Sequence, residues 1–109
     1  ELKEKLKSLV EELQLKSVVN FHGYINQISD REKYLSILNS LDIYTVTSIL
    51  DSDTFGVAGV EASALGLPVV VSDVGGLPEV IDDNVTGIVV PPKNSEALAK
   101  AIIFLIKNL

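Results

Sequence analysis

Apolar residues recur every three or four positions in three stretches of the chain, and this spacing predicts three amphipathic helices. The first covers residues 2 to about 14. The second begins at a Ser29–Glu32 capping box and runs to Ser40. The third is capped by Asn94 or Ser95. The expected apolar faces contain Leu2, Leu6, Leu9, Val10 and Leu13 in the first helix, Leu35, Leu38 and Leu41 in the second, and Leu98, Ile102, Leu105, Ile106 and Leu109 in the third.

Short apolar runs, several of them rich in β-branched residues, predict strands that alternate with helices. They cover residues 18–21, 43–47, 69–71 and 86–90. Val69–Val71 is apolar without interruption, as expected of a strand that is covered on both faces. The order of elements predicts an α/β fold: a Rossmann-like, doubly wound parallel sheet with helices on both faces.

A short central helix is predicted over residues 55–65. Asp53 and Thr54 can cap its start, and Leu65-Gly66-Leu67-Pro68 ends it. Glu61 is its only charged residue, and most of the others are small. Small side chains let a helix lie close to a sheet, or let a ligand lie close to the helix.

The start of this central helix suits a phosphate group, because its free N–H groups and the positive end of its dipole face outward there. Glu61 lies about 9 Å further along the axis, at about 1.5 Å per residue. That is near the distance from a diphosphate to a ribose, whose two hydroxyls a carboxylate can accept as hydrogen-bond donors. The simpler alternative is that Glu61 points into solvent.

Two further loops follow predicted strands and are therefore expected at the same edge of the sheet, where doubly wound folds bind ligands. His22-Gly23-Tyr24 follows the first strand, and Asp73-Val74-Gly75-Gly76 follows Val69–Val71. For His22 a loop histidine without chemistry is the favoured interpretation, and Tyr24 serves equally well as a packing residue. Pro78 is expected to begin a short helix.

Composition narrows the class of protein. With 109 residues the chain is one domain or a piece of one, and it has no cysteine, which excludes disulfides and thiolate metal sites and favours the cytoplasm. It has no apolar run near the ~20 residues of a membrane span and no recognisable secretory signal. The net charge of −6 argues against general nucleic-acid binding.

The charges are unevenly distributed along the chain. Between Lys33 and Lys93 there are eight acidic residues and no Lys, Arg or His. A diphosphate bound at the central helix would therefore need positive charge from elsewhere.

Asp53 and Glu61 are separated by seven residues, and Phe55-Gly56 follows the first acid after one residue. Together with residues 68–79, this arrangement resembles the donor-binding half of the glycosyltransferases of family 4. Those are two-domain enzymes of the GT-B fold that mostly retain anomeric configuration. The likeness covers nearly the whole chain and extends to residues 21–24, the strand after Asp42, and residues 86–92.

The resemblance implies roles for individual residues. Asp53 stands where the family has a catalytic acid that contacts the transferred sugar, although the family residue is a Glu, one methylene longer. Glu61 would bind the ribose hydroxyls. The other substrate-binding residues implied are Phe55, Gly56 and Val57 at the sugar or phosphates, and Gly23 and Tyr24 at the nucleobase.

For the whole chain, the resemblance implies a single nucleotide-sugar-binding domain fragment over residues 1–109. It would be the C-terminal half of a GT-B enzyme, truncated at its N-terminus and lacking the acceptor domain and the first strands of its own domain. That enzyme would be a retaining hexosyltransferase, active on a nucleoside diphosphate sugar and an acceptor glycan, lipid or small molecule. The family's Arg and Lys that clamp the donor phosphates lie upstream, so the fragment alone would be inactive.

The expected partners follow from the same resemblance. They are the nucleotide-sugar donor and the chain's own N-terminal acceptor domain, with no cofactor, metal or nucleic acid. Membrane contact would come only through the acceptor domain, so the expected location is the cytoplasm or the inner membrane face.

Two alternatives stay open. A non-enzymatic nucleotide-sugar sensor or assembly module could keep this fold without transferring sugar, and an upstream phosphate clamp and acceptor domain would argue against it. A phospho-acceptor signalling domain could use an acid such as Asp42, but the acidic cluster usual at the end of its first strand is missing.

Overall fold

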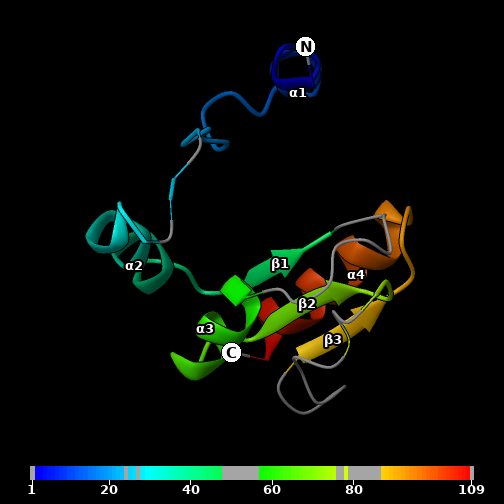
Figure 1. Ribbon diagram of the computed structural model, residues 1–109. Coiled ribbons are helices and arrows are strands. Elements are labelled where there is room, and N and C mark those ends of the chain that lie inside the picture. Colours follow the sequence, from blue (N-terminus) through cyan, green and yellow to red (C-terminus); the bar gives the residue numbers. More distant parts are fainter. Residues whose placement is uncertain are drawn as a thin grey trace. The chain divides into compact units, whose positions relative to one another are not determined.

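The computed structural model describes residues 2–23, 25, 26, 28–47, 57–75, 78 and 87–108, without the side chains of residues 57–59. The chain divides into two compact units, Glu1–Tyr34 and Leu35–Leu109. The described elements are α1 (Leu2–Glu12), α2 (Arg31–Asn39), β1 (Tyr44–Val46), α3 (Val57–Ala64), β2 (Val69–Ser72), β3 (Gly87–Val90) and α4 (Ser95–Lys107) (Figure 1).

The second unit is built on a parallel sheet with the strand order β1-β2-β3. Thr45 pairs with Val70, and Val70 pairs in turn with Ile88. All four residues of the central strand β2 are buried, which confirms the prediction of a strand covered on both faces. The described part of the sheet is therefore the expected parallel α/β arrangement.

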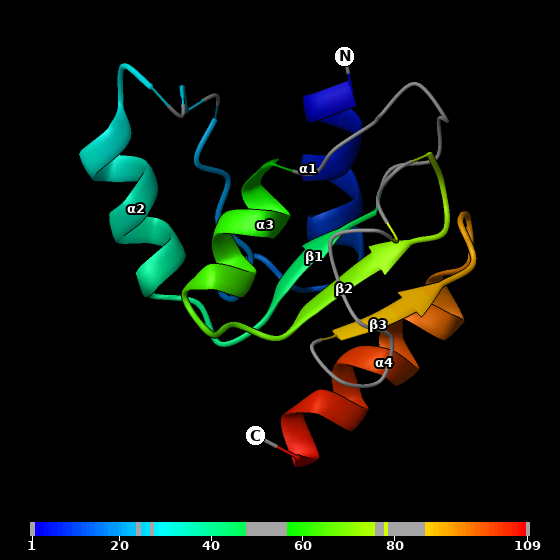
Figure 2. The same cartoon turned by 60° about the horizontal axis from the view of Figure 1, so that its bottom comes forward.

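Helices α3 and α4 cover opposite faces of this sheet (Figures 1 and 2). On one face, Val70, Val90 and Ala101 of α4 form a buried cluster. Side chains alternate along a strand, so Val69 and Val71 point to the other face, where α3 packs and buries Ala62 completely. The small residues noted in the α3 sequence thus allow a close approach of helix and sheet.

The C-terminus of α3 ends as the sequence predicts. Gly66 adopts φ +84°, the left-handed conformation that glycine reaches without a Cβ clash. The Gly66 N–H donates to Ser63 O at 3.0 Å and the Leu67 N–H to Ala62 O at 3.0 Å. This pair of bonds is a Schellman motif, which satisfies two of the carbonyls that a helix end leaves free.

Helix α4 begins at one of the two caps expected. The Asn94 side-chain oxygen accepts the Ala97 N–H at 2.9 Å, so Asn94 and not Ser95 is the N-cap. The face of α4 that covers the sheet is centred on Ala101, with Leu98 and Leu105 partly buried beside it. Ile106 was expected on this face but is 58% exposed, because it lies about 100° around the helix from Leu105.

Helix α1 has the predicted bounds within two residues, but none of its residues is buried. On its apolar face, Leu2, Leu6 and Leu9 are 43–70% exposed. The helix ends in a second Schellman motif, in which Leu15 N–H donates to Val10 O and Gln14 N–H to Glu11 O. Here the left-handed position is held by Gln14, at φ +59°.

The strand predicted over residues 18–21 is not present. The N–H groups of Val18 and Val19 both donate to Leu15 O at 3.0 Å, so the backbone forms a turn. In a strand these N–H groups would be directed sideways, toward a neighbouring strand. Val18 is 69% exposed. The β-branched residues that suggested a strand are used in a local turn of the first unit.

Helix α2 begins one residue later than the capping-box prediction. Asp30, not Ser29, holds the N-cap position, because its backbone oxygen accepts the first helical hydrogen bond, from the Tyr34 N–H at 2.9 Å. Asn26 organises the preceding turn: its side-chain oxygen accepts the N–H groups of Ile28 and Ser29 at 2.8 and 2.9 Å. The predicted inward face is confirmed at Leu38, which is 2% exposed.

Candidate functional site at the carboxyl edge of the sheet

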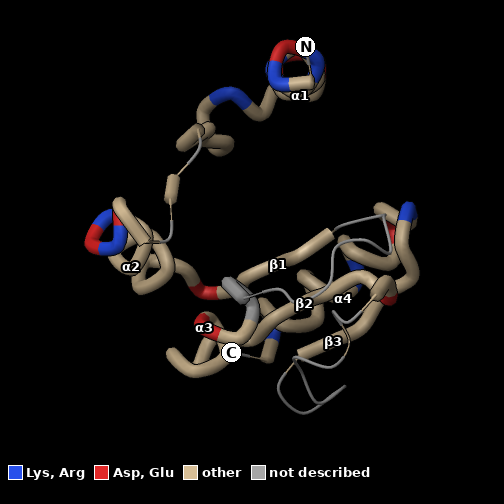
Figure 3. The backbone as a smooth tube through the Cα atoms, viewed as in Figure 1, with Lys and Arg blue, Asp and Glu red and all other residues tan. Residues whose placement is uncertain are grey.

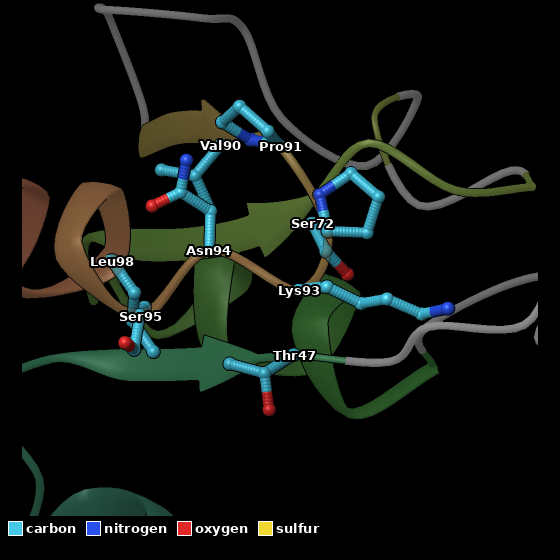
Figure 4. Close-up of a pocket in the computed structure, with 9 residues that line it drawn as sticks. Thr47, Ser72, Val90, Pro91, Lys93, Asn94, Ser95 and Leu98 are labelled. Atoms are coloured by element: carbon cyan, nitrogen blue, oxygen red, sulfur yellow. The ribbon is translucent and has the colours of Figure 1, made fainter.

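The carboxyl ends of the described strands meet at one edge of the second unit, because all three strands are parallel. Thr47 follows β1, Ser72 ends β2 and Val90 ends β3. A cavity of about 280 Å³ opens among them. Its remaining walls come from the turn that connects β3 to α4 and from the start of α4: Pro91, Pro92, Lys93, Asn94, Ser95 and Leu98 (Figure 4).

The floor of the cavity is held by hydrogen bonds between the strand ends. Ser72 is 2% exposed, and its hydroxyl donates to Val46 O at 3.4 Å. The Asp73 N–H donates to Val90 O at 2.8 Å, which ties β2 to β3 beyond their ladder. The chain then turns away with a 2.9 Å bond from Val74 N–H to Ser72 O. These bonds fix the position of the Ser72 hydroxyl at the edge.

Lys93 lines this cavity from the turn after β3, and its side chain is exposed. It adopts φ +56°, between Pro92 and the N-cap Asn94. Figure 4 shows its side chain extending from the turn toward the open side of the edge, with the ammonium end away from Ser72 and Thr47. An ammonium group is a donor that suits an oxyanion, whereas the single hydrogen of the Ser72 hydroxyl is already donated to Val46 O.

Among the predicted site residues, Val57 and Glu61 lie on α3, the helix that follows β1 in the chain. Glu61 is half-buried and directly precedes the fully buried Ala62. Gly23 lies in the first unit, has φ +74° and would have nothing within 4 Å of an added Cβ. Its open surroundings agree with a backbone position that something else can approach, and its role in binding stays a prediction.

The remaining predicted site residues lie outside the described part of the chain. They are Asp53, Phe55, Gly56 and Tyr24, and the Gly76 end of the glycine loop lies outside as well. Most of the short helix expected after Pro78 also does. Their assignments stay predictions.

Sequence reasoning did not single out Thr47, Ser72 or Lys93 as site residues. A signal was nevertheless present, because each follows or ends a predicted strand within three residues. Applying the rule that ligands bind at the carboxyl ends of strands to every predicted strand end, and not only to residues 22–24 and 73–76, would have found them.

The described residues contain no group of three or more His, Asp or Glu side chains placed to hold a metal ion. Helices long and apolar enough to cross a membrane are also absent from the described ranges. None of the residues in the three described strands is charged, and the described charged residues lie on helices and in the connections between elements (Figure 3).

Comparison with known families assigns this chain to a class of protein. Residues 1–109 match the family of glycosyl transferases group 1 over their full extent. The chain belongs to this family. An uncharacterized glycosyltransferase of Methanocaldococcus jannaschii is 36% identical over 99 residues, which are 91% of this chain and 24% of that protein.

Solved structures agree with the family assignment. Sucrose-phosphate synthase from Thermosynechococcus elongatus superposes with a TM-score of 0.84 at 33% identity, over 96% of this chain and 25% of the other. Anabaena HepE, solved in complex with UDP-glucose, superposes with a TM-score of 0.82 at 27% identity, over 96% of this chain and 27% of that one. The chain thus spans about a quarter of the length of these proteins, and they share the α/β architecture of GT-B glycosyltransferases.

Proposed function

We propose that this chain is a fragment of the donor-binding domain of a glycosyltransferase and binds a nucleoside diphosphate sugar at the carboxyl edge of its sheet. The observation that carries the proposal is the cavity at the ends of three parallel strands, in a chain that belongs to a glycosyltransferase family over all its residues. Doubly wound sheets bind ligands at this edge. The likeness to HepE, solved with UDP-glucose, supports the choice of donor class.

Within this proposal, α3 addresses the nucleotide. Glu61 accepts hydrogen bonds from both ribose hydroxyls, which makes two charge-assisted bonds to one carboxylate. Phe55, Gly56 and Val57, at the helix start, meet the phosphates or the sugar through backbone N–H groups. Gly23 and Tyr24 hold the nucleobase.

For the whole enzyme, we infer a hexosyltransferase that retains anomeric configuration, with Asp53 at the transferred sugar. Stabilising the negative charge of the departing diphosphate is then the main catalytic device. The acceptor, a glycan, lipid or small molecule, would be bound by a separate N-terminal domain. We expect the enzyme in the cytoplasm or at the inner face of the membrane, working without cofactor or metal.

The role of Glu61 can be tested by NMR titration of the 109-residue chain with UDP-, GDP- and ADP-glucose. We expect weak binding, with a Kd near the millimolar range, and a preference for one base. Glu61→Ala should reduce occupancy at a fixed, subsaturating ligand concentration by about ten- to a hundredfold, because charge-assisted bonds contribute ~1.5–3 kcal/mol.

The matched control is Asp42→Ala, which removes an exposed carboxylate at the amino end of β1, opposite the proposed site. It should leave occupancy within about twofold of the parent. Equal effects of the two substitutions would contradict the ribose assignment. A longer protein that binds the donor but transfers no sugar would favour the non-enzymatic module instead.

A further inference from the structure

A donor diphosphate at this edge faces an electrostatic problem. The chain has eight acidic residues and no base between Lys33 and Lys93. A nucleoside diphosphate carries two to three negative charges, so its approach to this stretch is unfavourable unless a cation lies nearby. Lys93 is the first cation after the acidic stretch.

The fold places Lys93 at the carboxyl edge of the sheet, where strand β1 of the acidic stretch also ends. Thr47, directly after β1, and Lys93 line the same cavity, although they are far apart in sequence. Ser72, at the end of the strand between them, completes the wall (Figure 4). Of the described residues, Lys93 is the only charged one that lines this cavity.

The backbone around Lys93 is well fixed for a turn. Two prolines precede it, each with φ held by its ring, and the Asn94 cap that follows is bonded to the Ala97 N–H. Lys93 itself holds φ +56°, a conformation that side-chain-bearing residues rarely adopt. The direction of the Lys93 Cα–Cβ bond is thus set by its neighbours, and the ammonium group can reach the edge from there through the flexible side chain.

From this juxtaposition we propose that Lys93 contacts the phosphates of the donor and supplies positive charge from within this chain. The inference rests on the proposed function and makes it more specific. It assigns the ammonium group to the diphosphate, and leaves the nucleoside to other residues. Thr47 and Ser72 line the same cavity, and the Ser72 hydroxyl is held by its bond to Val46 O.

The test compares UDP with uridine, which lacks the phosphates, in NMR titrations of the 109-residue chain. Lys93→Ala should lower occupancy by UDP about tenfold at a fixed ligand concentration, because it removes a charge-assisted contact. Occupancy by uridine should stay within about twofold. The dependence of UDP binding on salt concentration should also weaken in the variant.

Two further variants separate this role from general electrostatics and from folding. Lys100→Ala removes an exposed cation of α4 that does not line the cavity, and should leave UDP occupancy within about twofold of the parent. Lys93→Arg keeps the charge and should restore most of the binding. Each variant's NMR spectrum reports whether the fold is intact.

Equal losses for Lys93→Ala and Lys100→Ala would overturn the inference, and so would an equal loss of UDP and uridine binding in Lys93→Ala. Both outcomes leave the proposed function standing, because the parent chain still binds the nucleotide. If the parent binds neither compound nor any of the three nucleotide sugars, the proposed function itself fails, and the inference fails with it.

Discussion

Strand β2 and helix α1 are equally clear in the sequence pattern but differ completely in burial. Val69, Val70 and Val71 of β2 are fully buried between two helices. Leu2, Leu6 and Leu9 of α1 form an equally regular apolar face, yet each is at least 43% exposed. The spacing of apolar residues therefore identifies an element, whereas burial depends on what covers the element.

The difference should be visible in energetics, since deleting a buried methyl group costs transfer free energy and leaves a cavity, and deleting an exposed one does neither. The described sheet should account for most of the stability of the second unit. The α1 face should contribute little within this chain.

The largest expected effect is for Val70→Ala. It should lower the free energy of unfolding by about 2 kcal/mol, because Val70 packs in the cluster with Val90 and Ala101. Leu6→Ala, which removes more carbon atoms from a 43% exposed site, should cost about 0.5 kcal/mol or less. Urea unfolding monitored by circular dichroism measures both. A larger loss for Leu6→Ala would show that the α1 face is covered in solution.

The next effect concerns the end of α3. Gly66→Ala should lower the free energy of unfolding by about 1 to 2 kcal/mol, because alanine at φ +84° carries the Cβ clash of left-handed backbone. No neighbouring atom lies within 4 Å of the added Cβ, so the cost is conformational. Gly66→Asn should cost less, since asparagine tolerates this conformation better. Equal losses for the two variants would point to a steric cause instead.

A gain of about 1 kcal/mol is expected for Ser63→Ala on α3. In the described part of the chain, the Ser63 hydroxyl is buried and has no hydrogen-bond partner, which is costly for a polar group. The control is Ser36→Ala on α2, an exposed helical serine that reports the difference in helix propensity alone. Thermal unfolding should show a clearly larger rise in Tm for Ser63→Ala than for the control. Equal shifts would mean that the Ser63 hydroxyl has a hydrogen-bond partner in solution.

The smallest effect is expected at the end of α1, where Gln14 occupies the position that Gly66 holds in α3. Gln14→Gly should stabilise the chain by about 0.5 kcal/mol, because relief of the φ +59° backbone outweighs the extra freedom of glycine in the unfolded state. Gln14→Ala should change stability by less than half of that. If glycine destabilises the chain, measured by urea unfolding, the left-handed turn is not maintained in solution.

The parallel sheet and its helices could be predicted from the sequence, because strands such as Val69–Val71 and caps such as Asn94 have strong local signals. The prediction of a strand at residues 18–21 was wrong for a physical reason. β-branched residues favour a strand only where another strand can pair with it, and here the N–H groups of Val18 and Val19 donate to Leu15 O. The exposure of Ile106 likewise depends on how much of the α4 surface the sheet covers.

The roles predicted for individual site residues stay predictions. The acidic spacing around Glu61 indicated the family, since it belongs to one contiguous motif. The cavity at Thr47, Ser72 and Lys93 was not predicted, because its walls come from three segments that only the sheet brings together. Sites assembled from distant segments leave no local spacing to recognise.

The central claim is that the carboxyl edge of the sheet binds a nucleotide sugar, and chemical-shift mapping tests it most directly. UDP-glucose is titrated into the ¹⁵N-labelled chain, with glucose alone as the control. The account predicts concentration-dependent shifts at the backbone amides of Thr47, Ser72, Lys93 and the α3 helix, and none with glucose. Shifts confined to α1, or equal shifts with glucose alone, would contradict it.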